Sequence, residues 1–157
     1  MYQLRGQRVE ALSEEHIRRT AMSFCNFFGM KPTKGRNKRY DKSLEKLSSY
    51  GITINPVDDA EWSAALHGLI SGHYDPQSAT ISVPEHIYLE ACAGDRIALS
   101  VVLHEIGHMV LGHQPLMHFS SVPATENEDA EWQADAFAEH ALKFLGYDSM
   151  QLSFEFY

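Results

Sequence analysis

Apolar residues recur at helical spacing near the start of the chain. The segment 13–29 opens with Ser13 and two glutamates, which favour a helix start, and it closes at Gly29. Its apolar residues lie three or four positions apart, at Ile17, Ala21, Phe24 and Phe28. This spacing predicts a helix with one buried face.

Beyond this helix the apolar runs become shorter. Residues 44–50 keep a helical spacing and predict a short helix that ends at Gly51. Apolar runs bounded by turn residues then predict three strands, which lie within 51–57, 66–75 and 78–85. The turn-forming run Tyr74–Ser78 makes the second and third strands a hairpin.

The longest apolar segment, 96–111, comes after a helical turn predicted at 85–92. It is apolar almost all round, as is typical of a helix at the centre of a domain, and Asp95 is suited to cap it. A last helix is predicted from Thr125 to Gly146. The run Thr-Glu-Asn-Glu at its start has the spacing of a capping box, and glycine favours a helix end.

These elements predict one α+β domain that spans the whole chain, residues 1–157. Residues 1–50 would supply N-terminal helices and a basic loop, and residues 51–145 the core. In the core, we expect a short antiparallel or mixed sheet to pack on the central helix, with the last helix alongside.

Composition places the chain among soluble globular proteins, with 44% hydrophobic and 22% charged residues. No stretch reaches the ~18 apolar residues of a membrane span, and the N-terminus has no apolar signal segment. Cys25 and Cys92 stand far apart without a CxxC pair, which predicts two buried thiols. We therefore expect a cytoplasmic protein with no membrane contact.

The formal net charge is −8, but the basic residues are concentrated in one segment. Seven of the thirteen lie between residues 31 and 46: Lys31, Lys34, Arg36, Lys38, Arg39, Lys42 and Lys46. Tyr40 is the single aromatic residue in this run, so stacking on nucleic-acid bases has little support. We interpret the segment as a solvated loop and do not expect direct nucleic-acid binding.

The central helix carries the pattern His104-Glu105-Ile106-Gly107-His108. Two histidines four residues apart lie on one helix face, where both imidazoles can bind the same cation. Glu105 is displaced by about 100° around the helix axis, which keeps it off the metal. It can then act as general base toward a water molecule that attacks a carbonyl. The pattern predicts a zinc site with His104 and His108 as ligands.

A hydrolytic zinc site needs a third protein ligand and an open position for water. A three-histidine site would place a histidine six residues beyond His108, but that position holds Gln114. Glu131 on the last helix is preferred, because Asp135 lies on the same face and can accept a hydrogen bond from a ligating histidine. The rival carboxylates are Glu126, Glu128, Asp129 and Glu139.

Two segments together resemble the ImmA/IrrE family of metallopeptidases: VVLHEIGHMVLGH and, a short gap later, EWQADAFAEHAL. Glu131, Ala134, Phe137 and Ala138 match the E-x-x-A-x-x-F-A segment of that family. The hairpin GHYDPQSATISV is similar to the strands that precede the metal helix there. The resemblance covers about Gly51 to Leu145.

This resemblance implies a small gluzincin-like α+β domain that uses Zn²⁺, with Glu131 as the third ligand. It also implies a protein partner that is cleaved or regulated, a transcriptional repressor of helix-turn-helix type, often on a phage or other mobile element or in stress responses. No DNA-binding domain is evident at either end, so this repressor would be a separate protein. We expect a zinc-dependent endopeptidase with Glu105 as its base. The alternative is a non-catalytic zinc-containing regulatory protein, an antirepressor or toxin-antitoxin component that sequesters its partner.

Four further side chains are candidates for stabilising the oxyanion that forms at the cleaved carbonyl: His73, Tyr74, His113 and His118. Each is a weaker prediction than the ligands, because a structural role is more common for such residues. An exposed edge of the hairpin would offer an extended peptide a strand to pair with.

Overall fold

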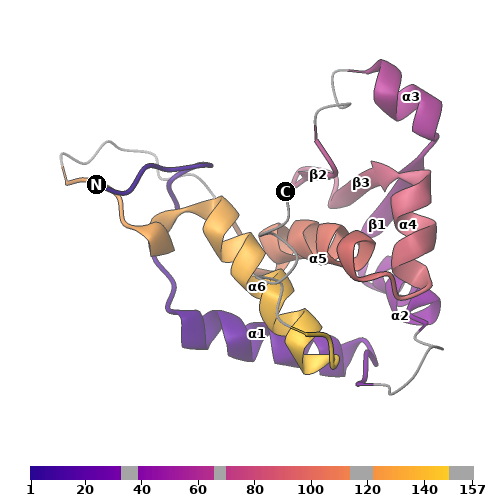
Figure 1. Cartoon of the computed structure of the whole chain (residues 1–157), viewed down its shortest axis with the longest axis horizontal. Coiled ribbons are helices and arrows are strands. Elements are labelled where there is room, and N and C mark those ends of the chain that lie inside the picture. The colour runs from indigo at the N-terminus through magenta and orange to yellow at the C-terminus, as the bar shows by residue number, and fades with distance from the viewer. Residues whose placement is uncertain (33–38, 66–69, 114–121, 149–157) are drawn as a thin grey trace.

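The computed structural model describes residues 1–32, 39–65, 70–113 and 122–148. Within these ranges, helix α5 (Arg96–Val110) runs through the middle of the molecule (Figure 1). Helix α4 (Glu85–Cys92) and a small sheet pack against it, and so does α6 (Ala130–Phe144). Helix α1 (Glu14–Phe27) in turn packs on α6. The predicted α+β architecture, with a central helix beside a second one, is confirmed.

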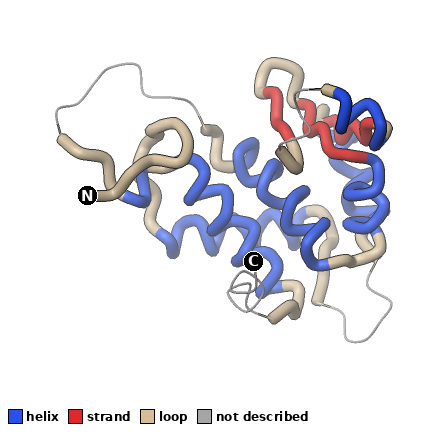
Figure 2. Tube along the Cα trace, turned by 45° about the horizontal axis from the view of Figure 1, so that its top comes forward, coloured by secondary structure: helices blue, strands red, loops and turns tan. Residues whose placement is uncertain are grey.

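The described part of the sheet contains β1 (Thr53–Val57), β2 (His73–Asp75) and β3 (Thr80–Pro84). β3 is central, parallel to β1 and antiparallel to β2, so the sheet is mixed and β2 lies at an edge. Figure 2 shows the strands gathered at one end of a largely helical molecule. The β2–β3 pair confirms the predicted hairpin.

The second strand is shorter than predicted. Residues 70–72 are not in a strand, and residues 66–69 lie outside the described residues. A helix that the apolar pattern did not predict, α3 (Asp59–Ala64), precedes this segment. Asp58 caps it by accepting hydrogen bonds from two N–H groups of its first turn. Trp62 anchors it, because the buried indole N–H donates to the Ile70 carbonyl at 2.9 Å.

The other predicted helix boundaries are close to those observed. Ser13 caps α1 by accepting from the His16 N–H, and Asp95 caps α5 by accepting from the Ala98 N–H. The short helix predicted at 44–50 begins earlier, as α2 (Asp41–Lys46) followed by the 3-10 helix η1 (Leu47–Tyr50). The central residues of the predicted basic loop, 33–38, lie outside the described residues.

The last helix, α6, begins at Ala130, later than the predicted start at Thr125. The capping box of Thr125 and Glu128 is present, but it caps a short 3-10 helix, η3 (Glu126–Glu128). Asp129 then adopts an extended conformation and becomes the N-cap of α6. The reason is tertiary, because the fully buried Asp129 carboxylate also binds two backbone N–H groups of the N-terminal segment, residues 1–12.

The crossing of α5 and α6 is close because small residues meet there. A Cβ atom on Gly107 would lie 3.2 Å from the Phe137 Cβ and 3.3 Å from the Ala134 Cα. The core around this crossing includes Phe24, Leu103 and Phe137, all buried. Gly107 thus lets the helix with the two histidines approach the helix that carries Glu131.

Cys25 and Cys92 are buried and unpaired, as predicted. Burial raises the pKa of the Cys25 thiol to about 12 and also raises that of Cys92. Among the helices that the structure describes, none has both the length and the apolar character needed to cross a bilayer.

Candidate metal centre

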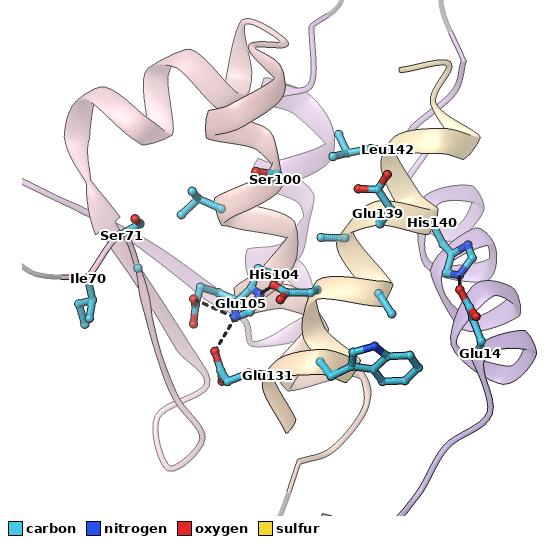
Figure 3. Close-up of a pocket in the computed structure, with 16 residues that line it drawn as sticks. Glu14, Ile70, Ser71, Ser100, His104, Glu105, Glu131, Glu139, His140 and Leu142 are labelled. Atoms are coloured by element: carbon cyan, nitrogen blue, oxygen red, sulfur yellow. Dashed lines mark hydrogen bonds and ion pairs between the residues drawn. The ribbon is translucent and has the colours of Figure 1, made fainter. Parts of the chain in front are cut away.

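Helix α5 presents His104 and His108 to the same side, one turn apart. Their rings lie 4.8 Å apart, centroid to centroid. In each ring the Nε2 atom faces Glu131 of α6, at 3.1 Å from Oε1 for His104 and 2.9 Å from Oε2 for His108. Figure 3 shows Glu131 facing His104 across the gap between the two helices. The structure therefore brings the three predicted ligands together.

This arrangement fits a zinc ion. One ligand atom from each of His104, His108 and Glu131 can be chosen so that all lie within 4.8 Å of one another. Tetrahedral ligands about 2.1 Å from zinc are separated by about 3.4 Å. The distances from the Glu131 oxygens to the two Nε2 atoms, 3.1 and 2.9 Å, are close to this value. Two imidazoles and one carboxylate are also the donor set of a common class of hydrolytic zinc sites, which leaves a fourth position for water.

The other ring nitrogen of His104 is held by a carboxylate. Its Nδ1 lies 2.7 Å from Asp135 Oδ1, and Arg5 Nη2 lies 2.8 Å from Asp135 Oδ2. An ionised carboxylate can only accept, so Nδ1 donates and Nε2 is left to face the cluster. Asp135 thus has the contact that the sequence predicted for it.

The other ring nitrogen of His108 is held by a second histidine. His108 Nδ1 lies 2.8 Å from His113 Nδ1, and His113 Nε2 lies 2.7 Å from Gln133 Oε1. The fully buried Gln133 donates its amide N–H groups to the carbonyls of Glu10 and Asn127, both at 2.8 Å. Both nitrogens of His113 are therefore engaged, and neither is directed at a substrate carbonyl.

Glu105 lies beside the cluster rather than within it. Its Oε2 is 4.0 Å from His104 Nε2, and the residue is only 8% exposed. Burial raises the pKa of this carboxyl, although the nearby histidines oppose that effect. A carboxylate at this distance can reach a water molecule placed at the cluster.

The electrostatics of the cluster favour a bound positive charge. Burial alone lowers the pKa of His104, but the hydrogen bonds to Asp135 and Glu131 outweigh it and raise that pKa to about 10. Hydrogen bonds from both histidines lower the pKa of Glu131 well below its usual range. For Asp135, burial acts to raise the pKa, but the hydrogen bonds and charges of His104 and Arg5 together outweigh it and lower the pKa. Burial lowers the pKa of His113.

Two cavities flank the cluster and share part of their lining. The larger, of about 630 Å³, has an apolar wall that includes Val101, Trp132 and Leu142. Leu142 is labelled in Figure 3. The smaller, of about 400 Å³, lies against the N-terminal segment and the edge strand β2. Glu105 and Glu131 line both cavities. The cluster is therefore open on two sides.

The four other carboxylates considered as third ligand lie outside the cluster of His104, His108 and Glu131. Glu128 pairs with Arg8, and Asp129 caps α6. Glu139 lines the larger cavity, and Glu126 begins η3; neither belongs to the His-His-Glu cluster found in the described residues. Of the five acids considered as third ligand, Glu131 is the one that lies in the cluster with the two histidines.

Two residues that support the cluster were missed by sequence reasoning. Arg5 contacts Asp135 across 130 positions of the chain, and no local pattern links the two. Gln133 could have been noticed as a polar residue that belongs to the buried face of α6. Among the oxyanion candidates, His73 and Tyr74 line the smaller cavity, whereas His118 lies outside the described residues.

No solved structure gives a significant match to this chain. Its curated relatives are glutamyl-tRNA(Gln) amidotransferase subunits. The one from Sulfurihydrogenibium sp. is 32% identical over 90 residues, or 54% of this chain and 17% of that protein. The one from Brevibacillus brevis is 40% identical over 80 residues, 49% of this chain and 16% of that protein. The one from Shouchella clausii is 29% identical over 118 residues, 73% of this chain and 24% of that protein.

The chain thus spans at most 24% of the length of these relatives, too little to carry their activity over to it. A family model gives the stronger result. The model of the IrrE N-terminal-like domain, peptidase family M78, matches residues 47–145, which is well over half of the chain and contains the His-His-Glu cluster with Glu105. The chain therefore belongs to the IrrE N-terminal-like family of M78 metallopeptidases, as its two sequence motifs predicted.

Proposed function

We propose that this protein is a zinc-dependent endopeptidase, with His104, His108 and Glu131 as zinc ligands and Glu105 as general base. The observation that carries the proposal is the convergence of the three ligand atoms within 4.8 Å, beside a buried carboxylate. Membership of a metallopeptidase family supports the same reaction class.

The chemistry divides between the metal and the chain. Zinc in such a site acts as a Lewis acid, which makes water more acidic and polarises the carbonyl under attack. Glu105 accepts the proton of the attacking water, and it returns a proton to the amine that leaves when the peptide bond breaks. Asp135 and His113 hold the two imidazoles in the orientation that the ligand set needs.

The shape of the site supports a polypeptide substrate. A scissile bond at the cluster would leave room for one flank of the substrate in each cavity, because Glu105 and Glu131 line both. The edge strand β2, whose first residue His73 lines the smaller cavity, can pair with an extended chain on that side. For the partner itself, we propose a separate helix-turn-helix repressor, on the basis of the family resemblance.

The test compares the wild type with Glu105→Gln on a proteome-derived peptide library, with new N-termini identified by mass spectrometry. Glu105→Gln keeps the ligand set, so both proteins should contain about one zinc per chain by elemental analysis. Cleavage by the variant should fall on the order of 10²- to 10⁴-fold, the usual contribution of a general base. Glu90→Gln, an exposed change on α4 outside both cavities, is the matched control and should cleave normally.

Equal cleavage by wild type and Glu105→Gln would show that Glu105 is not the base. A wild type that binds zinc but releases no fragments, from the library or from a repressor partner, would contradict the peptidase proposal. That outcome would favour the alternative of a regulatory protein that sequesters its partner and uses zinc for its structure.

A further inference from the structure

We propose that the N-terminal segment, residues 1–12, is an outer part of the metal centre and supports each of the three ligands through a separate contact. The family match begins at residue 47, so this segment lies outside it. The inference concerns zinc binding and uses the ligand set of the proposed function. It holds equally whether the metal serves hydrolysis or structure.

Asp129 anchors the segment at the start of α6. Its carboxylate accepts from the Tyr2 hydroxyl at 2.7 Å, the Arg5 N–H at 2.8 Å and the Gly6 N–H at 3.2 Å. The same carboxylate accepts from the Glu131 N–H at 2.9 Å. One buried side chain therefore fixes both the segment and the backbone of the carboxylate ligand.

The contact with Glu131 is direct. A Cβ atom on Gly6 would lie 2.7 Å from Glu131 Cγ and 3.4 Å from Glu131 N. The backbone of Gly6 is not among those with positive φ, so conformational freedom does not explain the glycine. The glycine is explained by the close approach of the segment to the ligand side chain.

The contact with His104 passes through one residue. The Arg5 guanidinium lies 2.8 Å from Asp135 Oδ2, while Asp135 Oδ1 holds His104 Nδ1 at 2.7 Å. Arg5 and Asp135 are both about half exposed, so the ion pair contributes little to folding. Its effect is to fix the rotamer of the carboxylate that orients the imidazole.

The contact with His108 sets its tautomer through a chain of hydrogen bonds. The Gln133 amide nitrogen donates to the carbonyl of Glu10 in the segment, so Gln133 Oε1 must accept from His113 Nε2. A neutral His113 then accepts at Nδ1, and His108 must donate from its own Nδ1. His108 Nε2 is thereby left with its lone pair directed at the metal position.

The first test measures the zinc dissociation constant of the full chain by competition with a chromogenic chelator. Arg5→Ala and Gly6→Ala should each weaken zinc binding about ten-fold, the lower end of the effect of outer partners on metal sites. Arg19→Ala removes a comparably exposed arginine from α1 and should bind zinc like the wild type. Unchanged zinc binding in both segment variants, with folding verified by circular dichroism, would overturn the proposal.

The second test reads the tautomers directly. In zinc-loaded wild type labelled with ¹⁵N-histidine, long-range NMR correlations should show Nδ1–H on His108 and Nε2–H on His113. The opposite tautomer on either ring would refute the hydrogen-bond chain. Gln133→Leu should remove the fixed tautomer of His113 and weaken zinc binding by about 10- to 100-fold. Should that buried variant fail to fold, the wild-type spectrum and the two segment variants still decide the matter.

These measurements separate the inference from the proposed function. Zinc affinity and tautomers are read without any substrate, so an inactive protein can still support the inference. Conversely, cleavage by the wild type with unchanged zinc binding in Arg5→Ala and Gly6→Ala would keep the peptidase and reject the role of the segment.

Discussion

At the scale of single residues, each histidine of the proposed zinc site has a hydrogen-bond partner on Nδ1, which leaves Nε2 to face the cluster. His104 illustrates this, since Asp135 takes the Nδ1–H and leaves Nε2 at 3.1 Å from Glu131. A histidine without such a partner can rotate or change tautomer, and both movements cost metal affinity. The ligand types alone therefore do not make the site.

Asp135→Asn tests this dependence. An amide keeps the shape of the carboxylate, but it cannot satisfy both His104 and Arg5, which are both donors. We expect zinc binding to weaken by about 10- to 100-fold, measured by chelator competition. Glu139→Gln, which removes the same charge one turn further along α6, is the control. Equal losses in the two variants would mean that net charge, rather than the hydrogen bond, controls the affinity.

At the scale of elements, the site depends on how closely α5 and α6 cross. Gly107 lies between the two histidines in sequence and meets the backbone of Ala134 and the ring of Phe137. The glycine costs α5 some helix propensity, roughly 1 kcal/mol relative to alanine. The close contact offsets this cost by bringing the ligands on both helices within reach of one ion.

Gly107→Val should separate the helices. Branched carbon atoms would overlap with Phe137 and Ala134, so we expect a loss of about 1–3 kcal/mol in the free energy of unfolding, measured in urea. Zinc binding should weaken in parallel, because the ligands move apart. Ile97→Val puts the same side chain on the exposed side of α5 and should have little effect. An unchanged unfolding midpoint for Gly107→Val would contradict the close crossing.

At the scale of the whole molecule, residues near the start of the chain contact residues 128 and 129, next to the proposed metal centre. The N-terminal segment runs beside η3 and α6, where the Val9 N–H donates to the Glu128 carbonyl at 2.8 Å. Arg8 reinforces this junction with an ion pair of 2.9 Å to Glu128. Hydrogen bonds from the Arg8 side chain and the Thr125 backbone lower the pKa of Glu128 to about 2.

This junction predicts a specific response to acid. The depressed pKa means that the stabilising contact is complete above the ordinary glutamate value of 4.5 and is lost as the pH falls toward about 2. Arg8→Ala should therefore raise the Glu128 pKa part of the way to 4.5, measured by carboxyl ¹³C NMR titration. The loss in the free energy of unfolding of Arg8→Ala, relative to wild type, should be largest above pH 4.5 and should shrink below it. Arg18→Ala, whose ion pair lies within α1, should leave the Glu128 pKa unchanged.

The sequence alone determined the features that follow from local spacing. Residues four apart on one helix share a face, so His104 and His108 were placed together without a structure. The same rule linked Glu131 with Asp135, and the caps Ser13 and Asp95 were predictable from their own neighbours. Even the missed helix α3 carries a local signal, since Asp58 and Glu61 have the spacing of a capping motif.

Tertiary structure decided whatever depends on residues far apart in the chain. The strand order β1-β3-β2, the break at Asp129 and the contacts of Arg5 and Gln133 all follow from packing between distant segments. Such contacts leave no periodic trace, because their spacing is set by the fold rather than by a helix or a strand. The sequence therefore specified the types of candidate ligand and their faces, whereas the fold specified the distances between them and the residues that hold them in place.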